Sequence, residues 1–205
     1  KKDSCLISDF LKVFKEQKDL EYEIRFKNMH RNIFINILET FNGLKIKKEI
    51  TDSFDYIYKD NRYTSKEYNK GPFTQIKKIS RLRHYIKDYD LLLSLAEETQ
   101  LEPLETLELT DEFVVRHKRR CSFIFHKFTV DLTIVNGKDY EIELEMSKSI
   151  EYKDIIDMIY YILKIKQESI YIISNNEASI VLENYSKYIE CTRSMVYLLD
   201  NNTRI

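Results

Sequence analysis

The chain has 205 residues, of which 43% are hydrophobic and 33% are charged, enough for one folded domain with a sizeable core. Its 33 Lys and Arg nearly balance 34 Asp and Glu, so the net charge of −1 predicts no general affinity for nucleic acids or membranes. Any site for a polyanion must therefore come from local segregation of charge.

The cysteines and the N-terminus predict a non-secreted, cytoplasmic protein. Cys5, Cys121 and Cys191 are odd in number and widely separated, which argues against a disulfide framework and against a zinc site. The first residues contain no apolar run typical of a signal peptide. The most apolar stretch, 155–165, is too short for a membrane span, and the missing initiator Met predicts a piece of a longer polypeptide.

Hydrophobic periodicity predicts the elements in chain order. Apolar residues at helical spacing predict helices over 4–18, 29–41, 151–166 and 177–190. Apolar and polar alternation predicts strands over 20–27, 45–59, 62–66, 73–89, 90–99, 107–120, 122–135, 138–147 and 169–173, with 194–199 as a last short segment.

Turn and capping residues divide these elements. Lys59-Asp60-Asn61 and Asn136-Gly137 predict hairpin turns, Glu102-Pro103 predicts a strand end, and Asn28 is the expected N-cap of the second helix. We expect the apolar stripe of the 151–166 helix to pack beneath the sheet. A platform against a neighbouring domain or a second protomer would use the same stripe, so a homodimer stays possible.

Many alternating strands and few helices predict an α+β fold dominated by β structure. A closed antiparallel β-barrel with flanking helices suits this pattern better than a sandwich. A barrel also accommodates strands with one charged and one apolar face, because the charged faces can form a lumen in which both signs meet. We expect one such domain over residues 1–205.

One strand carries a row of carboxylates. In Y-E-I-E-L-E-M at 140–146, Glu141, Glu143 and Glu145 share one face and the apolar residues share the other. These carboxylates lie roughly 6.5–7 Å apart along the strand. Because like charges at that distance repel, the face points either to bulk water or to a cation.

A second strand with charged residues on one face is predicted near the N-terminus. In E-Y-E-I-R, Glu21, Glu23 and Arg25 share one strand face. Alone, each acidic face could be a solvated strand surface. Together the two strands can meet around a divalent metal, and oxygen donors without His or Cys favour Mg²⁺ or Mn²⁺.

A third strand is basic. Arg116, Lys118 and Arg120 share a face, and three cations in a row suit a run of phosphates. A solvated strand or a localisation-signal-like cluster would have the same pattern. Asp131 and Thr133 also share a face, where they could orient a cation or a carboxylate, or simply form a polar outer surface.

The motifs occur in a fixed order: E-Y-E-I-R-F at 21–26, S-L-A-E-E at 94–98, R-H-K-R-R at 116–120, F-T-V-D-L-T-I-V at 128–135 and Y-E-I-E-L-E at 140–145. In this order they resemble the metal-dependent RNA 5′-triphosphatase domain of viral and fungal mRNA-capping enzymes, in the triphosphate tunnel metalloenzyme superfamily. The resemblance covers residues 20–147 and points most to capping enzymes of large DNA viruses, such as the mimivirus and African swine fever virus types.

The resemblance implies a role for each charged face. The metal would be held by Glu21, Glu23 and Glu145. The implied catalytic residues are Glu143, which would orient or deprotonate the attacking water, Glu141, and the triphosphate clamp of Arg116, Lys118 and Arg120. Supporting residues would be Asp131, Thr133, Glu98 and Arg25. Where relatives often carry a basic residue this chain has Thr129, so further phosphate contacts are expected from Lys127, Arg81 and Arg83.

The resemblance also implies a reaction and partners. The chain would hydrolyse the γ-phosphate of 5′-triphosphate RNA, with NTPs as possible substrates, in the first step of mRNA capping. A guanylyltransferase domain, linked or associated, would use the product, in a viral factory or a virion. A tunnel-type NTPase or polyphosphatase is the alternative enzyme, and an RNA-end-binding module is the non-catalytic alternative.

Overall fold

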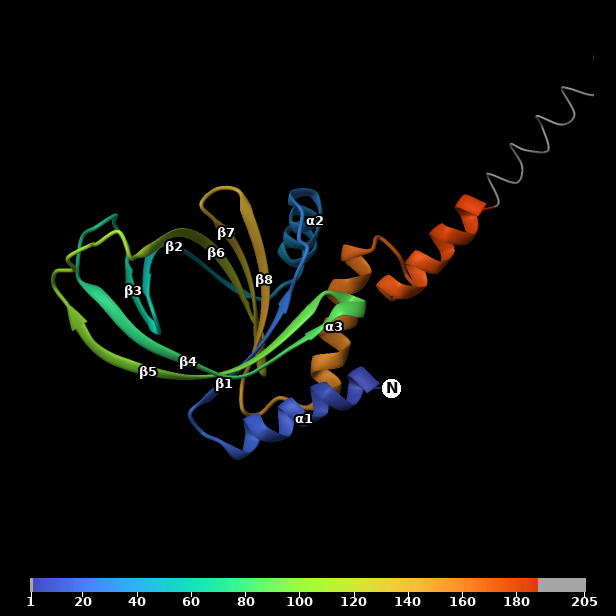
Figure 1. Cartoon of the computed structure of the whole chain (residues 1–205), viewed down its shortest axis with the longest axis horizontal. Helices are drawn as coiled ribbons and strands as arrows, with labels where there is room; N and C mark the ends of the chain where they lie inside the picture. The colour runs from blue at the N-terminus through green and yellow to red at the C-terminus, as the bar shows by residue number, and fades with distance from the viewer. Residues whose placement is uncertain (1, 188–205) are drawn as a thin grey trace, which may run out of the picture.

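Alternating residues build eight strands that close into one antiparallel barrel, with helices against one side (Figure 1). The computed structural model describes residues 2–187. In chain order the elements are α1 (Lys2–Glu16), β1 (Leu20–Phe26), α2 (Arg31–Asn42), β2 (Lys47–Tyr58), β3 (Asn61–Ser65), β4 (Phe73–Ile86), the short 3-10 helix η1 (Lys87–Tyr89), β5 (Leu91–Leu104), β6 (Val114–Ile124), β7 (Phe128–Val135), β8 (Asp139–Met146), α3 (Tyr152–Lys166) and a helical segment over 175–187. The predicted fold class is confirmed.

The barrel closes between its first and last strands. The strand order around it is β1-β5-β4-β3-β2-β6-β7-β8, and β8 pairs antiparallel with β1. Strands that are neighbours both in the sequence and in the barrel form hairpins, which include the predicted turns at 59–60 and 136–138. Closure encloses a lumen, although β3 is too short to cover the whole facing edges of β2 and β4.

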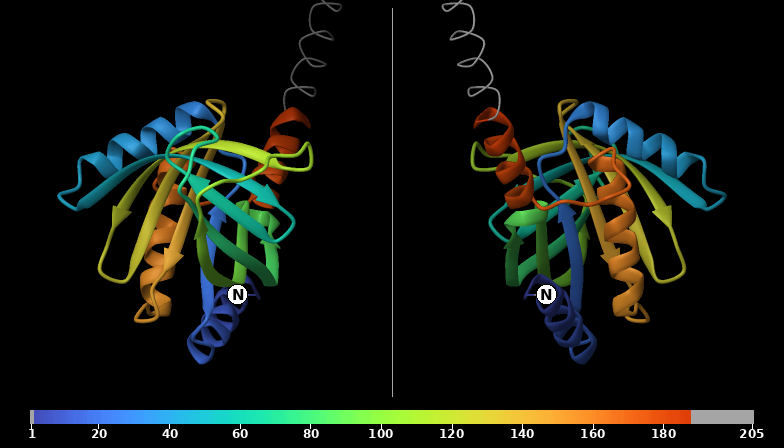
Figure 2. Two further views of the ribbon diagram at one scale, coloured as in Figure 1. Left: turned by 90° about the vertical axis from the view of Figure 1, so that its left-hand side faces the viewer. Right: turned by 90° about the vertical axis from the view of Figure 1, so that its right-hand side faces the viewer.

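The strand alternation separates an apolar exterior from a charged lumen. On β1, Tyr22 and Ile24 are fully buried on the outer face, while Glu21 and Glu23 point into the lumen. The main hydrophobic core lies between this outer face and the helices α1, α2 and α3, which Figure 2 shows gathered on one side of the barrel. Burying each large apolar side chain there contributes about 1.5–3 kcal/mol to stability.

One lysine fixes the start of β1. Lys148, just after β8, donates hydrogen bonds from Nζ to the backbone oxygens of Phe14, Gln17 and Leu20 at 2.7–2.9 Å. The same ammonium lies 3.6 Å from the centre of the Phe14 ring. The joint between α1 and β1 is therefore held against the end of β8, which sets where the charged face of β1 enters the lumen.

Helix α3 packs where the sequence predicted. Glu151 and Asp154 form a reciprocal capping box at its start. Ile155, Ile159 and Ile162 are buried in the core that α3 shares with α1, α2 and the barrel wall. Among the described residues, no helix combines the length and the apolar character needed to cross a bilayer.

Some predicted boundaries are wrong. Residues 107–113 form a loop because no neighbouring strand pairs with them, and β5 continues through Pro103 to Leu104. The predicted strand 122–135 belongs to two strands, because the chain turns at 125–127. This turn contains no Gly or Pro, and the apolar alternation continues through Phe125 and Phe128, whose rings stack, so nothing in the sequence indicates it.

Further differences concern caps and the C-terminal part. Asn28 does not cap α2: it has φ of 54°, its amide donates to Asp90, and His30 is the N-cap residue. Residues 169–173 form no strand, and Tyr171 is 75% exposed. The segment 194–199 and the end of the helix predicted over 177–190 lie outside the described residues.

The Asp90 carboxylate links three elements of the fold. It accepts hydrogen bonds from the Tyr85 hydroxyl at 2.7 Å, from Asn28 Nδ2 at 2.8 Å and from Lys166 Nζ at 3.2 Å. Lys166 also donates to the backbone oxygen of Lys27. The end of β1, the β4–β5 turn and the end of α3 therefore share one carboxylate.

Replacing Asp90 by Asn should destabilise the protein in a pH-dependent way. Burial alone would raise the pKa of Asp90, but the hydrogen bond from Tyr85 and the charge of Lys166 outweigh it and lower that pKa. Such a carboxylate stabilises the fold above the ordinary Asp pKa and loses this contribution as the pH falls through its lowered value. Asp90→Asn should therefore reduce the free energy of unfolding by about 1–2 kcal/mol near neutral pH, and the difference should shrink below about pH 4.

Urea denaturation of both proteins across this pH range measures the difference. The control is Asp157→Asn, which removes a carboxylate from the exposed pair with Lys153 and should change stability by less than about 0.5 kcal/mol. A difference for Asp90→Asn that grows on acidification would contradict the assignment.

Candidate active site

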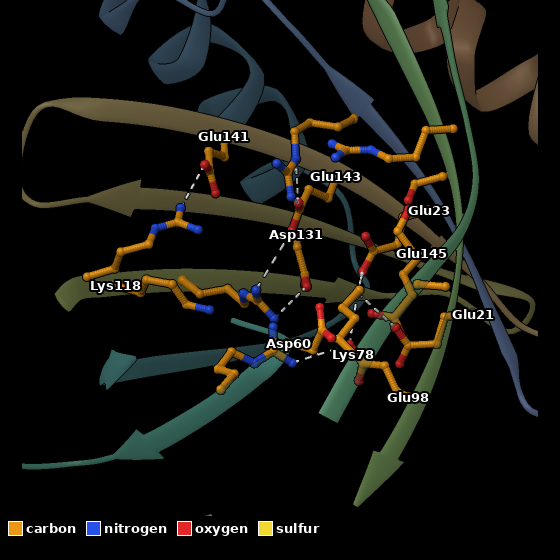
Figure 3. Close-up of a pocket in the computed structure, with 18 residues that line it drawn as sticks. Glu21, Glu23, Asp60, Lys78, Glu98, Lys118, Asp131, Glu141, Glu143 and Glu145 are labelled. Carbon is orange, nitrogen blue, oxygen red and sulfur yellow. Dashed lines mark hydrogen bonds and ion pairs between the residues drawn. The ribbon is translucent and has the colours of Figure 1, made fainter. Parts of the chain in front are cut away.

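The lumen is lined almost entirely by charged side chains. Eighteen residues surround a cavity of about 410 Å³ (Figure 3). Eight are acidic: Glu21, Glu23, Asp60, Glu98, Asp131, Glu141, Glu143 and Glu145. Seven are basic: Arg25, Arg62, Lys78, Arg83, Arg116, Lys118 and Arg120. Since the two signs nearly balance, their separation within the lumen decides what the cavity can bind.

The pairing of β1 with β8 brings the two predicted carboxylate strands together. Glu23 lies directly opposite Glu145, and Arg25 lies directly opposite Glu143. Within the described residues Glu145 forms no ion pair, and its carboxylate is accessible to water in the cavity. Burial, with the nearby charges of Asp131 and Glu23, raises the pKa of Glu145. Two like charges facing each other across a ladder are destabilising unless a cation compensates them.

Lys78 on β4 supplies part of that compensation. Its Nζ lies 2.8 Å from Glu98, 2.9 Å from Glu23 and 3.1 Å from Glu21. Burial, reinforced by the neighbouring Glu98, raises the pKa of Glu21 to about 7 despite the charge of Lys78. Burial lowers the pKa of Lys78, but the surrounding carboxylates outweigh it and raise that pKa above its ordinary value.

The opposite wall holds the cationic face of β6. Arg120 contacts Asp131 at 3.0 Å and donates from Nε to the Thr133 hydroxyl at 3.3 Å. Arg116 donates to Glu141 at 2.7 Å. These guanidinium groups are held by carboxylates and hydroxyls from β7 and β8, so their orientation is set before any ligand arrives.

Glu143 is the most buried glutamate of the predicted set. Its Oε1 accepts from Arg25 Nε at 2.6 Å and also contacts Arg25 Nη2, and its Oε2 lies 3.8 Å from Arg120. Burial would raise the pKa of Glu143, but the charges of Arg25 and Arg120 outweigh it and lower that pKa. Glu143 therefore stays ionised between two guanidinium groups.

Lys118 forms the least exposed ion pair of the lumen. Its Nζ lies 2.6 Å from Asp55 on β2, whose side chain is 2% exposed, and Thr64 donates a hydrogen bond to the same carboxylate. Burial and the neighbouring charges of Arg120 and Arg62 lower the pKa of Lys118 against the influence of Asp55. Burial alone would raise the pKa of Asp55, but Lys118 outweighs it and lowers that pKa.

The structure brings most of the predicted site residues together. Lining the lumen or bonded to its lining are Glu21, Glu23, Arg25, Arg83, Glu98, Arg116, Lys118, Arg120, Asp131, Thr133, Glu141, Glu143 and Glu145. Thr129 lies opposite Glu145 on β7.

Two of the residues predicted to contact phosphate lie away from the lumen. Arg81 lies outside the barrel and pairs with Glu97, and the register shift between Ser80 and Leu82 places it on the opposite face from Arg83, which lines the lumen. Lys127 lies in the β6–β7 turn and pairs with Asp154 of α3 at 2.9 Å.

Sequence reasoning missed four charged residues of this site. Lys78 and Arg62 contribute cations, Asp60 lines the cavity, and Asp55 holds Lys118. Lys78 follows Lys77 in a strand with several basic residues, so the sequence does not show which of them faces the lumen. Only the register of β4 against β5, which places Lys78 opposite Glu98, identifies Lys78 as the lumen residue. For Asp55 the sequence carries no comparable signal.

The residues present fit a hard divalent cation, although no ready-made site exists among the described residues. No group of three or more His, Cys, Asp or Glu side chains in 2–187 has a ligating arrangement. However, Glu145 faces Glu23 and has no ion-pair partner among the described residues, and Asp131 Oδ1 is buried there without a hydrogen-bond partner. Such excess oxygen donors suit Mg²⁺ or Mn²⁺.

Solved structures share this architecture. The triphosphatase of the mimivirus capping enzyme superposes with a TM-score of 0.64 at 19% identity, over 82% of this chain and 98% of that chain. The S. pombe RNA triphosphatase Pct1 superposes with a TM-score of 0.54 at 14% identity, over 94% of this chain and 91% of that chain. The chain has the triphosphate tunnel fold. The lumen is therefore called the tunnel below, and the resemblance stated from the motifs is confirmed at the level of fold.

No family model matches the sequence, and no curated protein matches it either. At 14–19% identity the structural likeness establishes the fold alone. The chemistry of the tunnel must be argued from its own side chains.

Replacing Asp55 by Asn should strongly destabilise the tunnel. The amide can still accept the hydrogen bond from Thr64, but Lys118 loses its counter-ion in a buried position. Breaking such a pair costs about 3–5 kcal/mol in the free energy of unfolding. The control is Asp52→Asn on the same strand, whose exposed carboxylate pairs with His117 and should contribute less than about 1 kcal/mol. Equal denaturation midpoints in urea for both variants would contradict the buried pairing.

Proposed function

We propose that the chain is a divalent-metal-dependent hydrolase that removes the γ-phosphate of triphosphate-ended RNA and leaves a 5′-diphosphate end. The observation that carries this proposal is a cluster of carboxylates beside a row of cations inside the tunnel. Glu21, Glu23, Glu98 and Glu145 lie around Lys78 on one side, and the cations of β6, each paired with a carboxylate, line the other (Figure 3). The fold likeness to proteins described as RNA triphosphatases supports it.

The cations of β6 would hold the triphosphate. Phosphoryl transfer needs positioning and charge neutralisation more than covalent help. Arg116 and Arg120 can each offer a planar fork to phosphate oxygens, while Lys118 offers a point charge. Their present partners, Glu141, Asp131 and Asp55, hold them in place, so little reorganisation is needed when a phosphate arrives.

The carboxylate wall would complete the site. Glu21, Glu23 and Glu145 would hold Mg²⁺ or Mn²⁺, which when bound supplies positive charge at the γ-phosphate. Glu143 would orient the attacking water: its Oε1 is engaged by Arg25, whereas its Oε2, 3.8 Å from Arg120, keeps room to accept a hydrogen bond. Glu141 would act through Arg116, the cation that it orients.

The product suggests the partner. A 5′-diphosphate RNA end is the acceptor for guanylylation in mRNA capping. We therefore propose that a guanylyltransferase domain, linked or associated, uses the product of this domain.

A tunnel-type NTPase or polyphosphatase is the second candidate. None of the described residues that line the tunnel is aromatic, and the uncharged ones are Ser80, Ser94 and Ala96. The tunnel thus offers contacts for phosphates but no stacking surface for a base, so its lining alone would accept the triphosphate of a nucleotide or of RNA.

Release of labelled phosphate tests the proposal. The chain should release γ-phosphate from triphosphate-ended RNA with Mg²⁺ or Mn²⁺, and a chelator should stop the release. Parallel assays with ATP and tripolyphosphate compare the substrate classes, and Glu145→Gln, prepared in the same way, controls for contaminating phosphatases. No release, or release that survives chelation, would remove the enzyme assignment and leave the RNA-end-binding module.

Arg120→Gln should lower kcat by about 10²-fold or more, the usual effect of removing one preorganised charge at a reacting centre. Its neighbour Arg119 is the matched control, because it points outside the barrel, is 71% exposed and pairs with Asp52. Arg119→Gln should leave kcat within about twofold. Steady-state kinetics with the same triphosphate substrate separates the two, and equal kcat values would refute the clamp.

A further inference from the structure

A second charged pocket adjoins the tunnel. It has a volume of about 420 Å³, and Glu141 lines both cavities. Since the described tunnel lining offers no stacking surface for a base, recognition of the group attached to a triphosphate is expected outside it. This pocket borders the tunnel at Glu141.

The pocket forms at the junction of three segments. The end of β1 contributes Lys27, the start of α2 contributes His30 and Arg31, and the β7–β8 turn contributes Lys138. The barrel register brings these segments together, because Phe26 lies opposite Ile142 and the next step along both strands reaches Lys27 and Glu141. Residues more than 100 positions apart in sequence therefore form one wall at the tunnel mouth.

The cations of this pocket lack counter-ions. Within residues 2–187, none of Lys27, His30, Arg31 and Lys138 forms an ion pair, and all four residues are exposed. The acidic residues of the pocket are Asp139 and Glu141, and Glu141 is already bound to Arg116. Inside the tunnel, by contrast, Lys78, Lys118 and the arginines of β6 are all paired.

We infer that this pocket binds the sugar–phosphate backbone of single-stranded RNA as it leaves the tunnel, with Lys27, Arg31 and Lys138 contacting its phosphodiesters. The inference rests on the proposed function and adds a binding subsite to it: the tunnel holds the triphosphate, and the pocket selects a polynucleotide over a free nucleotide. Unpaired Lys and Arg side chains along the path of a nucleic-acid strand are typical of sites that bind its sugar–phosphate backbone.

Continuity with the tunnel favours RNA over an acidic protein segment. A polynucleotide whose 5′ end lies between Arg116 and Glu143 carries its next phosphates toward Glu141, where the pocket begins. The pocket offers little apolar surface for a peptide: Met29 and Tyr140 are its large apolar members, both are half-buried, and the Tyr140 ring packs on Phe34.

The test neutralises the pocket and leaves the tunnel unchanged. The variant Lys27→Gln/Arg31→Gln/Lys138→Gln is compared with Lys12→Gln/Lys15→Gln/Lys164→Gln, which removes three exposed cations from the outer faces of α1 and α3. Fluorescence anisotropy with a 5′-hydroxyl RNA oligonucleotide measures binding without any triphosphate. The pocket variant should bind at least about tenfold more weakly, and the slope of log Kd against log salt should fall by about 2, as expected for three lost phosphate contacts on a single strand.

Kinetics gives the second readout. In the pocket variant KM should rise about tenfold or more for triphosphate-ended RNA of ten nucleotides and stay within about twofold for ATP, while the control variant should match the unmodified chain for both. Equal effects on RNA and ATP, an unchanged salt slope, or tighter binding of a polyglutamate peptide than of RNA would overturn the inference. If the unmodified chain hydrolyses neither substrate but only the pocket variant loses RNA binding, the proposed hydrolysis fails and the RNA surface stands.

Discussion

Charge compensation inside the lumen is the constraint on which the rest of the structure depends. Eight carboxylates and seven cations share a cavity of about 410 Å³, where the surrounding protein keeps their interactions strong. An unpaired charge there would be expensive, so almost every group is held by a partner from a neighbouring strand. Asp55 with Lys118 and Glu143 with Arg25 are the clearest cases, since each pair joins strands that are distant in sequence. Among the described tunnel residues, Asp60, Arg83 and Glu145 have no ion-pair partner, and Glu145, which faces Glu23, is the place where a further cation would relieve repulsion.

The barrel separates stability from chemistry to an unusual degree. Its outer face is covered by the three helices and carries most of the apolar core, whereas the lumen carries charge. Residues of one strand therefore serve different purposes at alternate positions, as Tyr22 and Glu23 show on β1. The low identity to the superposable structures is compatible with this arrangement, because an apolar exterior can be rebuilt from many residue combinations.

The alternation of charged and apolar residues was sufficient to predict the fold class and most of the lumen. Period-2 patterns on β1 and β8 are unbroken, so the faces of Glu21 and Glu143 could be assigned from sequence alone. The pattern fails where the register is irregular: the shift between Ser80 and Leu82 places Arg81 and Arg83 on opposite faces, although strict alternation would place them on the same one. It also fails where a partner is distant, since nothing near Lys127 in the sequence reveals its contact with Asp154 of α3.

Barrel closure through β1 and β8 has a consequence for how the site forms. Glu23 and Glu145 are 122 positions apart, and all the other strands lie between them along the chain. The two walls of acidic residues can meet only after the last strand has been made, and contacts at such separation form slowly because a long loop must close. During synthesis, the edge of β1 that pairs with β8 therefore stays unpaired, and the carboxylates of β1 stay in water, until β8 has been made. A chain interrupted before residue 139 would lack β8 and α3, so it would have neither the closed barrel nor the facing carboxylates of Glu23 and Glu145.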